Sequence, residues 1–228
     1  MPLRLSRGLI PISKAPVVGG AHVPLRIFSM IKDDAKWWDE HVQPFIDAKP
    51  GRADSGWNWP WKIFNLTRLA GEALRQRPRA FVAGVECASP PTFLPCIMSL
   101  LVETYADLAD SRLESVFLWY LSPAPEEFFR SGRGKVLGAV PKALMSIGMD
   151  MTITHSYNIM RRGRVGLHAA PSGGKELFDW YKDPARGGMI VIPKRQRLAG
   201  GWRRNDGRYF YHDEATAFEV SRRLDSLR

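Results

Sequence analysis

The amino-acid sequence predicts a mixed α/β fold in which a β-sheet is flanked by helices. Segments rich in Val, Leu and aromatic residues, typical of strands, alternate with segments whose apolar residues recur at helical spacing. Pro and Gly separate most of these segments. Of the 228 residues, 45% are hydrophobic and 25% are charged, which is typical of a globular protein with a sizeable core. A chain of this length predicts one domain or two small ones.

The first third of the chain is expected to contain one strand and two helices. Asp33 or Asp34 can cap the first helix, because an Asp side chain accepts hydrogen bonds from the free N–H groups of a first turn. Apolar residues from Ile63 to Leu74 form one helical stripe, and the following Arg77-Pro78 ends it. The expected elements are an opening strand at 8–18, a helix to about Asp47 and a helix to about Gln76.

Three strands are predicted in the middle of the chain, at 80–88, 92–104 and 114–122. The second is apolar nearly throughout, as a strand buried on both faces would be. The third ends at Pro123, and Pro cannot donate a hydrogen bond to a neighbouring strand.

The last third alternates helices with short strands. Apolar residues at helical spacing predict a terminal helix after Tyr209–His212, a short aromatic strand. The expected elements are a helix at about 137–160, a strand at 164–170, a helix at 173–182, strands at 189–192 and 209–212, and a helix at 214–227.

The turn at 132–140 is rich in Gly and basic residues. Glycines let backbone N–H groups approach a phosphate, and a helix that follows adds a favourable dipole. A plain surface turn has the same composition, so phosphate binding depends on what surrounds the turn. The sequence reads Gly132-Arg133-Gly134-Lys135-Val136-Leu137-Gly138-Ala139-Val140.

This order of elements around a phosphate-type turn resembles the cofactor half of the GNAT superfamily of N-acetyltransferases. The resemblance covers most of the chain in outline, with motif-level support from about Trp119 to Met189. It implies a mixed, mostly antiparallel central sheet flanked by helices, with an added C-terminal helix. It also implies one domain, 1–228, with 1–79 on the acceptor side, 80–192 as the cofactor-binding core, and a basic loop, strand and helix in 193–228.

The resemblance implies that acetyl-CoA (coenzyme A) is the cofactor. In the family the pyrophosphate binds at a pattern of Arg or Gln, two residues, Gly, one residue, then Gly or Ala. The matching register here starts at Lys135 and ends at Val140, and it departs from the pattern at both of these positions. In the family the strand before the turn separates from its neighbour and pairs with the pantetheine arm. The residues expected at the cofactor are Trp119, Tyr120, Leu121, Arg133, Gly134, Lys135, Val136, Leu137, Gly138, Ala139 and Val140.

Tyr181 is the main catalytic candidate that the resemblance implies. In the family a Tyr on this helix protonates the leaving thiolate, and a phenol can do so because it holds its proton at neutral pH. Glu86 and Glu103 are candidate general bases, because they are the acids within apolar strand segments. A solvent-facing position at a sheet edge is the alternative for each acid, and a water can replace a base residue. His168 is interpreted as a hydrogen-bonded structural residue.

Two other features suggest partners. One short segment contains three tryptophans, Trp57, Trp59 and Trp61. They can serve as core anchors or as a stacking surface for an aromatic group. The loop at 194–208 is basic and contains Trp202, which suits RNA or an acidic protein as well as a solvated loop. The net charge of +10 also favours anionic partners, although a basic soluble surface explains it too.

The sequence argues against several classes of protein. Cys87 and Cys96 make neither a disulfide framework nor a metal set, so a reduced, cytoplasmic location is expected. The sequence contains no run of about 18 apolar residues, so no membrane span is expected. The function expected is therefore acetyl transfer from acetyl-CoA to an amine on an unknown acceptor, tRNA-linked or protein. The alternative is an inactive module of the same fold that binds nucleic acid or a partner protein.

Overall fold

The computed structural model describes residues 11–66, 68, 69, 71, 76–87, 93–199 and 204–228. The strands are β1 (Lys14–Pro16), β2 (His22–Ser29), β3 (Pro78–Glu86), β4 (Phe93–Ala106), β5 (Glu114–Pro123), β6 (Val165–His168), β7 (Ile190–Val191) and β8 (Tyr209–His212). They form one sheet in the order β1-β2-β3-β4-β5-β6-β8-β7. Each neighbouring pair is antiparallel except β5 and β6, which run parallel.

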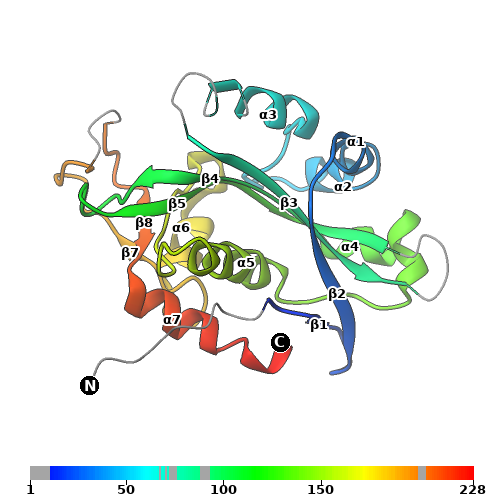
Figure 1. The fold of residues 1–228 in the computed structure, drawn as a ribbon. Helices are drawn as coiled ribbons and strands as arrows, with labels where there is room; N and C mark the ends of the chain where they lie inside the picture. The colour runs from blue at the N-terminus through cyan, green and yellow to red at the C-terminus, as the bar shows by residue number, and fades with distance from the viewer. Residues whose placement is uncertain (1–10, 67, 70, 72–75, 88–92, 200–203) are drawn as a thin grey trace.

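Helices cover both faces of this sheet. They are α1 (Lys32–His41), α2 (Gln43–Asp47), α3 (Trp59–Leu66), α4 (Glu126–Arg130), α5 (Leu144–Asn158), α6 (Gly174–Lys182) and α7 (Glu214–Arg222). In Figure 1, α1, α2 and α3 lie above the sheet, and α5 and α7 lie below it. The fold is therefore the mixed, mostly antiparallel sheet with flanking helices that the family resemblance implied.

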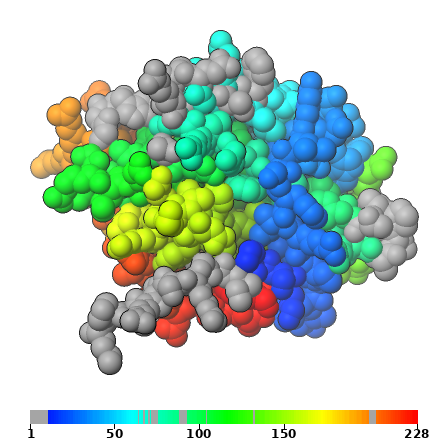
Figure 2. Space-filling model, viewed as in Figure 1, coloured from blue at the N-terminus to red at the C-terminus, as the bar shows by residue number. Residues whose placement is uncertain are grey.

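The helix α5 is the best-buried helix of the lower layer. It packs on β4 and β5, and α7 packs against it from the other side. Figure 2 shows it between the β1–β2 hairpin in blue and α7 in red. A Cβ on Gly148 would lie 2.6 Å from the Leu121 side chain, so this glycine lets α5 approach β5 closely. Close packing here fixes the first turn of α5 relative to β5.

Most predicted strands and helices are confirmed, with ends that move by a few residues. The helix predicted to about Gln76 corresponds to α3, which ends at Leu66, and residues 67, 70 and 72–75 lie outside the described residues. The predicted strands at 80–88, 92–104 and 114–122 correspond to β3, β4 and β5. The predicted strand Tyr209–His212 has the same ends as β8. The terminal helix α7 ends at Arg222, and Asp225–Leu227 form a separate 3₁₀ turn.

The N-terminal prediction is wrong in two places. Of the predicted strand at 8–18, residues 8–10 lie outside the described residues, and β1 covers only Lys14–Pro16. The sequence also missed β2, because Leu25 is its one buried residue and the strand shows no clear apolar alternation. The single helix predicted up to Asp47 is two helices, α1 and α2, which meet at Val42.

The predicted helix at 137–160 begins seven residues too early. Gly132–Leu137 form a 3₁₀ helix that Gly138 ends in a left-handed conformation, with a φ of 66°. The next residues pair with the end of β1 instead of continuing as a helix. The Val18 N–H donates to the Val140 carbonyl at 3.0 Å, and the Lys142 N–H donates to the Pro16 carbonyl at 2.7 Å. These tertiary hydrogen bonds move the start of the helix to Leu144.

Candidate active site

The parallel strands β5 and β6 separate in the middle of the sheet. They pair only where Val116–Leu118 lie beside Val165–Leu167. Beyond Leu118, β5 continues along β4 as far as Pro123, whereas β6 ends at His168. Among the described strands, none therefore pairs with the β6 side of β5 beyond Leu118. The family resemblance implied a separation at this strand.

A β-bulge lies where the two strands part. Leu100 of β4 is opposite Tyr120, and the next residue, Leu101, is opposite Leu118. Trp119 is therefore the extra residue on β5. A bulge bends its strand and leaves backbone groups out of the ladder, and such bulges are over-represented beside active sites. Here the bulge turns β5 away from β6 at the first residue after their pairing ends.

A cleft of about 660 Å³ opens at this separation. Its walls come from β5, from the end of β6, from the first turn of α5, from α6 and from the loop between α2 and α3. Its lining includes Asp54, Trp119, Met145, His168, Glu176 and Tyr181. Of the residues expected at the cofactor, Trp119, Tyr120 and Leu121 line this cleft.

The Gly-rich turn at 132–140 does not line the cleft. A Cβ on Gly134 would lie 2.2 Å from the Phe128 carbonyl oxygen, so this glycine lets the turn pack against α4. Arg133 and Lys135 are exposed. The turn's role in phosphate binding stays a prediction, and the segment that reaches the cleft is the first turn of α5, through Met145.

Tyr181 lies on α6 and faces the cleft. It is 6% exposed, and its ring packs on Phe210 at 5.6 Å between centroids. Burial raises the pKa of the Tyr181 phenol, and the nearby Asp54 carboxylate raises this pKa further. The phenol therefore keeps its proton at neutral pH. Among the described contacts, the Tyr181 hydroxyl makes no hydrogen bond that would divert it from a ligand.

The two predicted general bases lie away from the cleft. Glu103 accepts hydrogen bonds from Arg79 Nε at 2.8 Å and from His155 Nε2 at 3.0 Å. Glu86 is ion-paired with Arg26. Neither carboxylate lines the cleft. Their catalytic role stays a prediction, and both have partners that explain them as structural groups.

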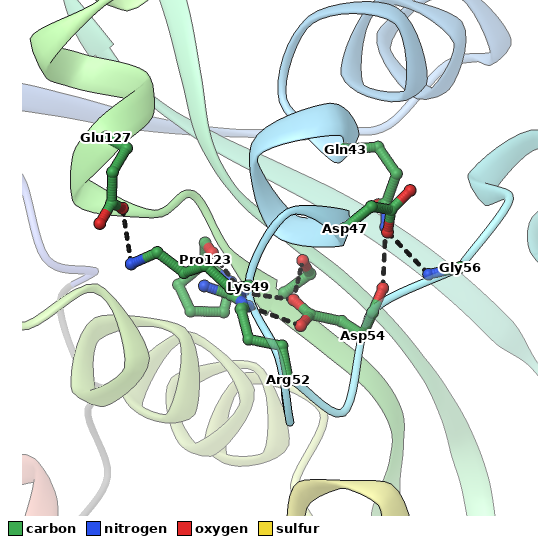
Figure 3. A network of polar contacts seen from close by, with 9 residues as sticks. Gln43, Asp47, Lys49, Arg52, Asp54, Gly56, Pro123 and Glu127 are labelled. Carbon is green, nitrogen blue, oxygen red and sulfur yellow. Dashed lines mark hydrogen bonds and ion pairs between the residues drawn. The ribbon is translucent and has the colours of Figure 1, made fainter.

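A buried acid, Asp54, lines the cleft from the loop between α2 and α3 and was not among the predicted site residues. The carboxylate accepts from Arg52 Nε at 2.8 Å, from Arg52 Nη2 at 2.5 Å and from the Ser122 hydroxyl at 2.6 Å. Figure 3 shows this network, in which Arg52 also donates to the Pro123 carbonyl at 2.9 Å. From the other side, the Gln43 amide donates to the Asp54 carbonyl at 2.8 Å. The loop is thereby fixed to the separated end of β5.

The histidine at the end of β6 also lines the cleft. Its Nε2 lies 2.9 Å from an Asp206 carboxylate oxygen, and its ring lies 4.5 Å from the Tyr209 ring. Partial burial raises the pKa of Asp206, but the hydrogen bond from His168 and that from the Arg208 N–H outweigh it and lower this pKa. His168 is hydrogen-bonded, as the sequence suggested. Its place in the cleft was missed, because Asp206 is 38 residues away in the sequence.

The tryptophan-rich segment divides between core and cleft. Trp59 is fully buried, and Trp61 is 61% exposed. Trp57 lines the cleft and contacts the Tyr120 ring edge-on at 4.7 Å. The Lys62 ammonium lies 4.8 Å from the Trp57 ring and 4.2 Å from the Tyr120 ring. Burial lowers the pKa of Lys62.

Two features are absent from the described residues. No group of three or more His, Cys, Asp or Glu side chains in this part of the chain is arranged to hold a metal ion. No helix in it has both the length and the apolar character needed to cross a membrane.

Comparison with known proteins places the fold. No protein-family model matches the sequence, and neither does any curated protein. Apo FdhC, a nucleotide-linked sugar GNAT, is 7% identical, with 96% of this chain and 98% of FdhC covered and a TM-score of 0.54. Spermidine N-acetyltransferase from Vibrio cholerae, in complex with CoA and spermine, is 14% identical over 85% of this chain and 98% of its own, with a TM-score of 0.44. A mutant of the AtaT toxin, bound to the C-terminus of the antitoxin AtaR and acetyl-CoA, is 15% identical. The match covers 85% of this chain and 95% of the toxin, with a TM-score of 0.43.

The likeness to FdhC extends over nearly the whole of both chains. The chain has the GNAT fold.

Proposed function

We propose that this protein is an acyl-CoA-dependent N-acyltransferase that moves an acetyl group from acetyl-CoA to an amine. One observation carries the proposal: β5 leaves β6 at the Trp119 bulge, and the Tyr181 phenol lies in the cleft that this opens. A fold alone does not establish a reaction. The proposal therefore depends on the parts of this cleft and on what each can do.

The cleft offers binding groups for both ends of coenzyme A. The last residues of β5 extend beyond the end of its pairing with β6 and line the cleft, and an extended chain with amide groups can lie along such a strand as a further strand would. At the first turn of α5, the first intrahelical bond runs from the Ile147 N–H to the Ala143 carbonyl. The N–H groups before Ile147 have no partner within the helix and suit a phosphate. Lys142 precedes this turn and adds positive charge.

Coenzyme A would supply the acyl group as a reactive thioester. The chain's own residues would orient it and handle protons. Backbone N–H groups near the bulge would stabilise the negative charge that develops on the acyl oxygen, as preorganised donors do in acyl transfer. Tyr181 would give its proton to the departing sulfur, because its phenol is protonated and lies in the cleft.

The charge of the protein supports an acceptor amine carried on an anionic molecule, such as aminoacylated RNA. The described part of the basic loop contains Lys194, Arg195, Arg197, Arg204 and Arg208. Residues 200–203, which include Trp202 and Arg203, lie outside the described residues. The loop meets the cleft through the contact between Asp206 and His168. An acidic protein is the other anionic partner that the basic loop would suit. A cytoplasmic location would suit either an RNA or a protein acceptor.

Calorimetric titration with acetyl-CoA tests the proposal. We expect saturable binding by the natural sequence and at least a tenfold loss of affinity in Met145→Glu, because the new carboxylate repels the phosphates at the first turn of α5. Met160→Glu is the matched control, because Met160 is exposed just after the other end of α5 and should leave affinity unchanged.

Absence of binding at millimolar acetyl-CoA would reject the proposed acyltransferase activity. RNA binding is the competing function, and its affinity should fall steeply with salt and weaken when Arg204 is neutralised. If RNA binds in this way while acetyl-CoA does not, the chain is a binding module with a GNAT fold.

A further inference from the structure

We propose that His168, oriented by Asp206, accepts the proton of the acceptor amine. This inference rests on the proposed acyl transfer and names the proton acceptor that the predicted acids do not supply. His168 is the last residue of β6, at the place where β5 leaves that strand, and it lines the cleft together with Tyr181. Its side chain is 25% exposed, so the ring is partly protected from water but open to a ligand.

The contact with Asp206 fixes which ring nitrogen can act. Asp206 accepts through one oxygen from His168 Nε2 at 2.9 Å and through the other from the Arg208 N–H at 2.9 Å. When the ring is neutral, a carboxylate at Nε2 holds the proton on that nitrogen, which leaves the lone pair on Nδ1. Among the described contacts, Nδ1 has no hydrogen-bond partner. The ring is therefore a proton acceptor held in one orientation.

Asp206 is itself held firmly at the end of β6. The Arg208 guanidinium donates to the Ala169 carbonyl at 2.8 Å and to the Ala170 carbonyl at 3.0 Å. The Asn205 amide donates to the Pro193 and Gln196 carbonyls, each at 2.8 Å, and so closes the base of the basic loop. Because Asn205 and Arg208, on either side of Asp206 in the sequence, are both anchored, the carboxylate is held beside His168.

Other carboxylates of the cleft are less suited to this role. Asp54 has its oxygens occupied by two Arg52 nitrogens and the Ser122 hydroxyl, so taking a proton would disrupt an ion pair. Glu176 is exposed in the first turn of α6. His168 combines partial burial, an open ring nitrogen and a fixed carboxylate partner. An imidazole paired with a carboxylate is a common general base in enzymes.

The protons and bonds balance in this scheme. The acceptor enters as an ammonium ion and gives one proton to His168. The amine nitrogen then bonds to the acyl carbon, and the carbon–sulfur bond breaks. The sulfur takes the Tyr181 proton, and the second proton lost by the nitrogen returns to Tyr181 through water. Water also removes the proton from His168, so the net change converts an ammonium ion and a thioester into an amide, a thiol and a proton in water.

The test compares two nucleophiles with acetyl-CoA as donor. Methylamine is almost fully protonated at neutral pH and must lose a proton before it attacks, whereas hydroxylamine is mostly unprotonated. We expect His168→Gln to slow thiol release with methylamine about 100-fold, the lower end of typical general-base contributions. The reaction with hydroxylamine should stay close to that of the natural sequence. Asp206→Asn should also slow the reaction with methylamine more than that with hydroxylamine, but by a smaller factor than His168→Gln.

His22→Gln is the control, because His22 is exposed on β2. Acetyl-CoA affinity, measured by calorimetry for each variant, separates the two proposals. If the natural sequence does not bind acetyl-CoA, the proposed function fails and this inference fails with it. If it binds, then an equal loss with both nucleophiles or no loss with either would overturn the role of His168 alone, whereas no transfer by the natural sequence would overturn both proposals.

Discussion

The Ser122 hydroxyl donates a hydrogen bond of 2.6 Å to the Asp54 carboxylate, and the two residues are 68 positions apart in the sequence. Ser122 lies on the part of β5 that has left β6, and Asp54 lies in the loop after α2. Arg52 strengthens this connection through its ion pair with Asp54 and its bond to the Pro123 carbonyl. One wall of the cleft is thus fastened to the strand that we expect to hold the cofactor.

Replacing Asp54 by Ala should destabilise the protein strongly. The change leaves the Arg52 guanidinium, which is 21% exposed, without its carboxylate partner. Breaking a buried ion pair on one side costs about 3 to 5 kcal/mol, and we expect the lower end because Arg52 is partly hydrated. Ser122→Ala removes one hydrogen bond and should cost about 1 kcal/mol. Urea unfolding measures both.

The control for this prediction is Asp179→Ala. Asp179 also pairs with a basic residue, Lys175, but both side chains of that pair are exposed. Exposed ion pairs contribute little to folding. If Asp54→Ala and Asp179→Ala unfold at the same urea concentration, the network in Figure 3 does not hold the loop in place.

Tyr181→Phe should slow catalysis while leaving binding intact. The substitution removes the hydroxyl and keeps the ring that packs on Phe210. Loss of a general acid lowers turnover about 100-fold, whereas acetyl-CoA affinity by calorimetry should stay the same. Tyr157→Phe is a matched control, because the Tyr157 hydroxyl bonds the Glu214 carbonyl and Tyr157 does not line the cleft. Unchanged turnover in Tyr181→Phe would show that another group protonates the thiolate.

The sequence could predict the elements whose own residues determine them. The strand β8 has an aromatic run between polar residues, and α6 has apolar residues four apart, so both were predicted within a residue of their ends. The start of α5 could not be predicted, because it depends on hydrogen bonds from 140–142 to β1, more than a hundred residues away.

The residues of the cleft were likewise predicted only where the sequence near them, or the family resemblance, indicates their role. Tyr181 and Trp119–Leu121 were predicted through the family resemblance, which concerns residues in or beside regular elements. Asp54 lies in a polar loop, and nothing in the local sequence indicates that it meets Ser122. Glu103 was favoured as a base because it follows an apolar strand. Its partners Arg79 and His155 come from β3 and α5, so only the tertiary structure shows that the carboxylate is already satisfied.

The stability of the protein should fall as the pH decreases from about 6.5 to about 4. His212 is fully buried on β8, and burial lowers its pKa to about 4. An unfolded histidine has a pKa of about 6.5, so in this window the unfolded chain binds a proton that the folded chain does not. The loss for this residue is about 3 kcal/mol, since one pKa unit corresponds to about 1.4 kcal/mol.

Urea unfolding at a series of pH values measures this effect. In His212→Leu the loss of stability over the window should shrink. It should not disappear, because burial also lowers the pKa of His155 despite the opposing effect of Glu103. His22→Leu, at an exposed position, should keep the full pH dependence. An unchanged slope in His212→Leu would mean that this histidine is protonated alike in both states.

The buried Asp150 should depend on Arg228 for its charge. Asp150 is 1% exposed on α5 and accepts from Arg228 Nη2 at 2.8 Å and from the Ser221 hydroxyl at 2.6 Å. Arg228→Met leaves this carboxylate buried without its cation, and we expect a loss of about 3 kcal/mol. The double variant Asp150→Leu with Arg228→Met removes both charges and should recover most of that loss, because apolar replacements of a buried pair are often neutral. Thermal or urea unfolding of the two variants measures the difference. If the double variant is no more stable than Arg228→Met, the ion pair holds α5 to the C-terminal segment by packing rather than by charge.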